Sequence, residues 1–111
     1  FIPFLRAARN TGYFVHLVYL WLRNPELARA RVALRVQRGG HDIPAADIER
    51  RYWRGLRNFF ELYSDVANAW TLGDNSGETF QVVAQKSGDH LMIYDQHRYD
   101  EIRHAAKKQS P

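Results

Sequence analysis

The chain of 111 residues is 45% hydrophobic and 14% aromatic, which is enough for one modest core and for no more than one domain. It contains no cysteine, which excludes disulfides and thiolate chemistry and is compatible with a reducing cytoplasm. The net charge of +4 allows anionic partners, and thirteen arginines against three lysines favour phosphate recognition, because the planar guanidinium group binds phosphate oxygens in pairs.

The first expected elements are a helix over about residues 3–10, ended by Gly12, and a strand over residues 14–22. The strand is apolar at nearly every position, which is typical of a parallel sheet with both faces covered. We interpret His16 as a core or sheet-edge residue rather than as a catalyst. The apolar run over residues 13–22 is about half a membrane span, and no signal-peptide pattern is present, so we expect a cytoplasmic protein.

Two arginine-rich helices follow, and eight of the thirteen arginines lie between residues 29 and 57. The first helix is expected from Pro25, which suits a first helical turn, to about residue 38. At about 100° per residue, one stripe of this helix is formed by Arg31, Arg35 and Arg38. The second helix is expected from near residue 44 to about residue 69, with Asp42 as its N-cap. Opposite its apolar side it carries Arg50, Arg54 and Arg57.

The join between these helices reads GGHDIP over residues 39–44. Two glycines followed by polar residues and a proline predict a mobile elbow, as in a lid that closes on a polyphosphate. The competing interpretation is a pair of ordinary solvated helix faces, with surface ion pairs such as Arg57 with Glu61 at the i, i+4 spacing. The helical pattern alone favours neither interpretation.

The remaining elements are a short strand over residues 70–74, a turn at residues 74–77, and a hairpin of residues 80–85 with 90–94. Asp95 is expected to cap a last helix to about residue 106, beyond which residues 107–111 are expected to fray. His97 and His104 are spaced i, i+7 on this helix, which does not match the i, i+4 spacing of helical metal ligands, so we predict no metal site there.

Three segments together resemble a known family: RVQRGGHDIP over residues 35–44, IERRY over residues 48–52, and LGDNS over residues 72–76. In these segments the chain resembles the C-terminal half of zeta-toxin-like P-loop kinases, specifically the small bacterial predicted ATPases related to zeta toxins. The resemblance spans about residues 4–102 and implies an α/β fold. The expected fold is a partial, nucleotide-kinase-like P-loop NTPase fold with parallel strands, flanking helices, a helical lid at about residues 29–58, and a small C-terminal hairpin and helix.

The resemblance implies a toxin–antitoxin kinase in which ATP, with Mg²⁺ held outside this chain, phosphorylates a small acceptor such as a UDP-linked amino sugar. A cognate antitoxin is a possible partner in such systems. The lid arginines of the family neutralise the charge of the transferring phosphoryl group. The matching positions here are Arg35, Arg38, Arg51 and Arg54, whereas Arg31 and Asn75 match ATP-binding positions.

The chain departs from the family in one respect. A Walker A loop needs the pattern G-x-x-x-x-G-K-[ST], and no two of the seven glycines are five residues apart. The proton-accepting aspartate of the family is also missing. Because residue 1 is Phe, we expect that a longer protein supplies both, and that the 111-residue chain alone is inactive.

Two other functions stay open. A small basic module could bind RNA or DNA through Arg50, Arg54 and Arg57, and a non-catalytic partner protein would leave an exposed sheet edge. The arrangement of the arginines discriminates between the kinase and the nucleic-acid-binding module. The kinase interpretation predicts that both stripes converge on one cleft beside the carboxyl ends of the strands, whereas a nucleic-acid module predicts an open, convex basic face.

Overall fold

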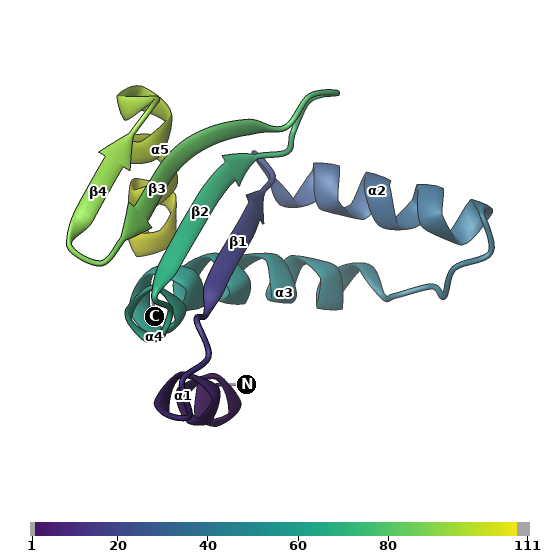
Figure 1. Ribbon diagram of the computed structural model, residues 1–111. Helices are drawn as coiled ribbons and strands as arrows, with labels where there is room; N and C mark the ends of the chain where they lie inside the picture. Colours follow the sequence, from purple (N-terminus) through teal and green to yellow (C-terminus); the bar gives the residue numbers. More distant parts are fainter. Residues whose placement is uncertain (1, 109–111) are drawn as a thin grey trace.

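The computed structural model describes residues 2–108 and shows an α/β fold with a four-stranded mixed sheet (Figure 1). In the sheet, neighbouring strands follow chain order: β1 (His16–Trp21), β2 (Ala69–Asp74), β3 (Gln81–Ser87) and β4 (His90–Ile93). Strands β1 and β2 are parallel, but both later pairs are antiparallel. The described sheet therefore contains one parallel pair of strands, where a sheet of parallel strands was expected.

The helices are arranged around this sheet, and α3 and α5 lie behind it in Figure 1. The helical elements are α1 (Ile2–Asn10), α2 (Pro25–Gln37), α3 (Ala45–Asn58), a π-helical turn η1 (Phe59–Tyr63), α4 (Ser64–Val66) and α5 (Gln96–Lys108). The core joins α3 and α5 to the sheet through fully buried side chains, among them Leu56, Leu72 and Ile102. Burial of each such side chain stabilises the fold by about 1.5–3 kcal/mol.

Strand β1 is covered on one face only, which corrects the expectation drawn from its apolar run. Tyr19 and Trp21 pack into the core, whereas Val18 and Leu20, which point the other way, are 57% and 54% exposed. Strand β1 is also an edge strand of the described sheet. His16 lies at this edge, as expected, with its Nε2 3.0 Å from the Thr71 hydroxyl.

The ends of several elements match the sequence pattern. Pro25 lies in the first turn of α2, and the side chain of Asn24 accepts a hydrogen bond from the Leu27 amide at 2.8 Å. Asp95 caps α5 by accepting a hydrogen bond from the Arg98 amide at 3.0 Å. Helix α5 continues to Lys108, so residues 107 and 108 do not fray, and the rest of the expected frayed end, residues 109–111, lies outside the described residues.

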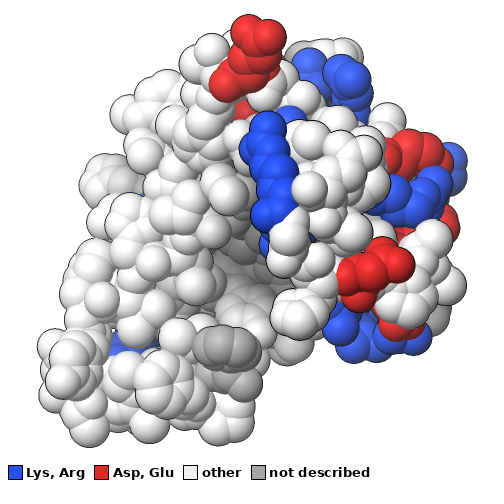
Figure 2. Space-filling model, turned by 90° about the vertical axis from the view of Figure 1, so that its right-hand side faces the viewer, with Lys and Arg blue, Asp and Glu red and all other residues white. Residues whose placement is uncertain are grey.

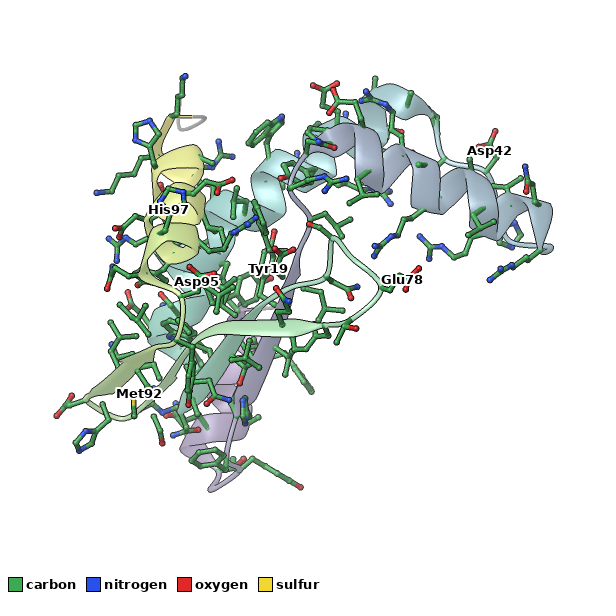
Figure 3. The ribbon with its side chains drawn as sticks, turned by 90° about the horizontal axis from the view of Figure 1, so that it is seen from above. Tyr19, Asp42, Glu78, Met92, Asp95 and His97 are labelled. Carbon is green, nitrogen blue, oxygen red and sulfur yellow. The ribbon has the colours of Figure 1, made fainter. Side chains whose placement is uncertain are left out.

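Two other predicted ends are wrong. The N-cap of α3 is Pro44, which makes no side-chain capping bond, so Asp42 does not cap the helix. Asp42 is exposed instead, at the outer end of the α2–α3 hairpin (Figure 3). The expected single second helix also contains the π-helical turn η1, and helical structure ends at Val66 rather than near residue 69.

The glycine pair of the elbow ends α2 in a defined geometry. The Gly40 amide donates to the Arg35 carbonyl at 2.8 Å and the Gly39 amide to the Val36 carbonyl at 3.0 Å, which is the Schellman pattern. Gly39 has a φ of +95°, a conformation that other residues adopt with strain. The two glycines therefore serve to close the helix.

Candidate anion-binding groove

The candidate site lies at the carboxyl ends of the two parallel strands. Because β1 and β2 run in the same direction, Trp21 and Asp74 end at the same edge of the sheet. The Asn75 amide donates to the Trp21 carbonyl at 2.8 Å, which extends this pairing by one residue. Helix α2 begins only four residues after β1, so its arginines start from the same edge. Ligands of open α/β sheets commonly bind at this position.

The loop after β2 is held by polar contacts to three other elements. Asp74 is only 8% exposed, and its carboxylate accepts from the Ser76 amide at 2.9 Å and pairs with Arg98 of α5 at 3.3 Å. The Ser76 hydroxyl accepts from the Arg23 amide at 2.9 Å, and the Ser76 carbonyl accepts from the Arg31 guanidinium at 3.2 Å. These contacts fix Asn75 in the middle of the loop.

A groove of about 560 Å³ opens between this loop and α2. Its basic and polar lining consists of Arg31, Arg35, Arg38 and Asn75, and its apolar lining includes Leu20, Leu22, Val32 and Leu34. Figure 2, seen from the outer end of α2 and α3, shows a hollow beneath basic side chains, with a largely uncharged surface beside it. The groove can therefore bind an anion through guanidinium groups and hold an organic group on its apolar wall.

The charges of the groove are largely uncompensated. Within residues 2–108, neither Arg35 nor Arg38 forms an ion pair, whereas Arg29 on the same helix pairs with Glu26 and Glu49. The next acidic residue after Asp74 in the sequence is Glu78. It is exposed and lies on the side of the loop that faces α2 (Figure 3). It forms no ion pair within the described residues. A bound anion would thus meet two unpaired guanidinium groups.

The arginines of the second helix divide between different surfaces. Arg51 lines a smaller hollow of about 290 Å³, which adjoins the groove because both share Arg35 and Leu20. Arg54 is exposed and lines neither the groove nor this hollow. Arg50 pairs with Asp47 at 2.8 Å, and Arg57 lines a third hollow. The structure thus brings four of the six predicted site residues together, sets Arg51 beside them, and leaves Arg54 apart.

Two partly buried tyrosines, Tyr19 and Tyr52, support the wall that the two hollows share. The Tyr52 hydroxyl donates a hydrogen bond to the Leu22 carbonyl, which ties α3 to the end of β1. Burial raises the pKa of Tyr52 to about 12 and raises the pKa of Tyr19 further above its ordinary value. Both hydroxyls therefore remain neutral hydrogen-bonding groups at physiological pH.

Sequence reasoning missed the residues that hold the groove loop in place. Asp74 was expected only as part of a turn, and Arg98 only as a residue of the last helix. Their ion pair joins positions 24 residues apart in sequence, and no local pattern signals such a contact. The guanidinium carbon of Arg98 also lies 5.6 Å from the Trp21 ring centroid, so one side chain connects α5 with the ends of both parallel strands.

Comparison with known proteins gives one partial match. An uncharacterized protein of Haemophilus influenzae (strain Rd) is 35% identical over 48 residues, which are 43% of this chain and 34% of the relative. The matched part therefore spans about a third of that relative's length. No family model matches the chain, and no solved structure matches it. Helices long and apolar enough to cross a membrane are absent from residues 2–108, as are groups of three or more potential metal ligands.

Proposed function

We propose that this chain is the lid-bearing C-terminal part of an ATP-dependent phosphotransferase of the zeta-toxin type, with a P-loop fold and a small acceptor such as a UDP-linked amino sugar. One observation carries the proposal. Arg31, Arg35, Arg38 and Asn75 line a single groove at the carboxyl ends of β1 and β2. Phosphoryl transfer depends mainly on positioning and on neutralising charge, and guanidinium groups that converge on one groove can do both.

Each groove residue has a role in this proposal. Arg35 and Arg38 neutralise the phosphates of ATP, because they have no acidic partner within residues 2–108. Arg31 already donates to the Ser76 carbonyl, so it ties the loop to α2 and presents its remaining N–H groups to the nucleotide. Asn75 contacts the adenine, and the exposed Leu20 and Leu34 offer an apolar wall.

Arg51 would join the same site if the α2–α3 hairpin closed by a short distance, because its hollow already adjoins the groove. Arg54 is exposed and lines neither of these two hollows. In this proposal, the Walker A loop and the Mg²⁺ ligands belong to a segment outside these 111 residues. The protein acts in the cytoplasm, and a cognate antitoxin is one of its partners.

The alternative, a nucleic-acid-binding module, has less support in the geometry. It requires Arg50, Arg54 and Arg57 to share one open face, but Arg50 is paired with Asp47 and Arg57 lines a separate hollow. The convergence of the α2 arginines favours the kinase.

The first test uses the 111-residue chain and an ATP titration followed by isothermal calorimetry. We expect no turnover and weak, millimolar binding that is weakened about tenfold in Arg35→Ala or Arg38→Ala, since each removes a charge-assisted contact. Arg50→Ala is the matched control, because it removes an arginine that pairs with Asp47 outside the groove. Equal binding by all three variants, or turnover by the chain alone, would contradict the proposal.

The second test uses the longer protein, once a Walker A loop has been found upstream of this chain. There, Arg38→Ala should lower kcat by about 10³ or more, which is the effect of removing an arginine that stabilises the transition state. An unchanged kcat would remove Arg38 from the site.

A further inference from the structure

The hollow lined by Arg57, at the C-terminal end of α3, is a second basic concavity. It measures about 210 Å³ and is lined by Arg57, Phe60, Glu61, Arg103, Ala106 and Lys107. Three of these residues are basic and one is acidic. None of the six lines the α2 groove or the hollow of Arg51, so this surface is not explained by the proposed phosphotransferase site.

The hollow is built on the π-helical turn η1, which supplies Phe60 and Glu61. A π-helical turn inside an α-helix is rare and occurs frequently at functional sites. In the sequence, Arg57 and Glu61 have the spacing of a surface ion pair, but no such pair forms in the structure. Arg57 is half-buried at the wall of the hollow and, within residues 2–108, has no acidic partner.

Arg103 is held in place before any ligand binds. It donates a hydrogen bond to the Tyr99 hydroxyl at 3.2 Å, and its guanidinium carbon lies 5.6 Å from the Phe60 ring centroid and 5.7 Å from that of Tyr99. These contacts order the side chain without neutralising it. Its remaining N–H groups can bind an oxyanion with little further loss of conformational freedom.

We propose that this hollow binds the phosphate group of a small molecule. Arg57, Arg103 and Lys107 place three positive charges around one small concavity that also contains Glu61, but within the described residues none of the three forms an ion pair, and a bound anion would neutralise the excess positive charge. Two guanidinium groups suit the paired oxygens of a phosphate, and the Phe60 ring supplies an apolar surface for a short organic group. The volume of about 210 Å³ suits a phosphate group with a few attached atoms.

The probes are inorganic phosphate and phosphoethanolamine, and the measurement is an NMR titration of the backbone amides of the 111-residue chain. We expect saturable shifts in η1 and in the last turns of α5. Arg57→Ala and Lys107→Ala should each weaken binding about fivefold, and Glu61→Gln should tighten it about twofold, because that variant removes the one acidic side chain among the described residues that line the hollow. Both truncated side chains lie outside the buried core, so the fold is retained.

Arg35→Ala is the matched control, since it removes an arginine from the α2 groove and leaves this hollow intact. Phosphate can also bind in the α2 groove, but that binding would shift the amides of α2. These α2 shifts would be lost in Arg35→Ala and kept in Arg57→Ala and Lys107→Ala. The two sites can therefore fail separately. Absence of saturable shifts in η1 and α5, or shifts there that are equal in the wild type, Arg57→Ala and Lys107→Ala, would overturn the proposal. So would a single-stranded RNA that binds the same residues and is not displaced by either phosphate probe.

Discussion

Gly73 should be intolerant of a single added methyl group, because Phe80 lies directly over its Cα. A Cβ built at Gly73 would lie 1.9 Å from Phe80 Cζ and 2.1 Å from Cε1, far inside the ordinary carbon–carbon contact distance of about 3.5–4.0 Å. Gly73 does not have a positive φ, so an alanine meets no backbone strain there. The whole cost of Gly73→Ala therefore comes from moving the Phe80 ring.

The magnitude follows from how much Phe80 contributes. Full burial of a phenylalanine side chain contributes about 1.5–3 kcal/mol, and Phe80 is 38% exposed, so its ring contributes about 1–2 kcal/mol. Displacing the ring can cost no more than this contribution. Replacing a strand glycine by alanine returns about 0.5–1 kcal/mol through a lower entropy of the unfolded chain. We expect Gly73→Ala to lower the free energy of unfolding by about 1 kcal/mol.

A double-mutant cycle in urea separates the ring from the backbone. Phe80→Ala should cost about 1–2 kcal/mol, and Gly73→Ala introduced into Phe80→Ala should then cost nothing or be stabilising. Gly77→Ala is the control, because a Cβ there has no atom within 4 Å and Gly77 has no positive φ. Strictly additive effects of the two substitutions, or a Gly73→Ala protein as stable as the wild type, would refute the explanation.

Two further predictions concern the supports of the groove and of α5. The pKa of Tyr52 is raised to about 12 in the folded protein, so the unfolded chain ionises first, and stability that is fully present below about pH 10 should be lost as the pH rises toward 12. Urea unfolding at about pH 8 and at about pH 11 measures this loss of stability. The loss should be smaller in Tyr52→Phe, and an equal loss in that variant would assign the effect to other groups. Asp95→Ala should lower the free energy of unfolding by about 1 kcal/mol, whereas Asp95→Asn, which keeps a capping oxygen, should cost much less; equal losses would argue against capping.

Local patterns predicted the elements whose cause is local. Pro25 begins α2, Asp95 begins α5, and β3 pairs with β4 in the expected hairpin, and each of these signals involves residues close to one another in the chain. The bare face of β1 could not be predicted in the same way. A run of apolar residues shows that a strand is compatible with burial on both sides, but the side chains of Val18 and Leu20 are more than half exposed.

The candidate groove was predictable in part for the same reason. Arg31, Arg35 and Arg38 share one stripe of α2 through helical periodicity, and the short link from β1 sets them at the strand ends. The Asp74–Arg98 pair depends on how α5 packs against the sheet, which the spacing of residues along the chain does not specify. The π-helical turn η1 had no signal in the sequence either.

The divergence of the α3 arginines follows from the rotation of that helix. Leu56 of α3 and Phe59 of the adjoining turn η1 are buried in the core against the sheet, and they fix this rotation. At about 100° per residue, Arg54 lies about 160° from Leu56, on the solvent side, whereas Arg57 lies about 100° away in one sense and Arg51 about 140° away in the other. Arg57 therefore points toward α5, Arg54 toward solvent and Arg51 toward the hollow beside α2. The three positions span about 120° of the helix, so the two outer arginines reach the neighbouring elements on either side while Arg54 lies between them, and α3 thereby contributes one arginine to each of two separate hollows.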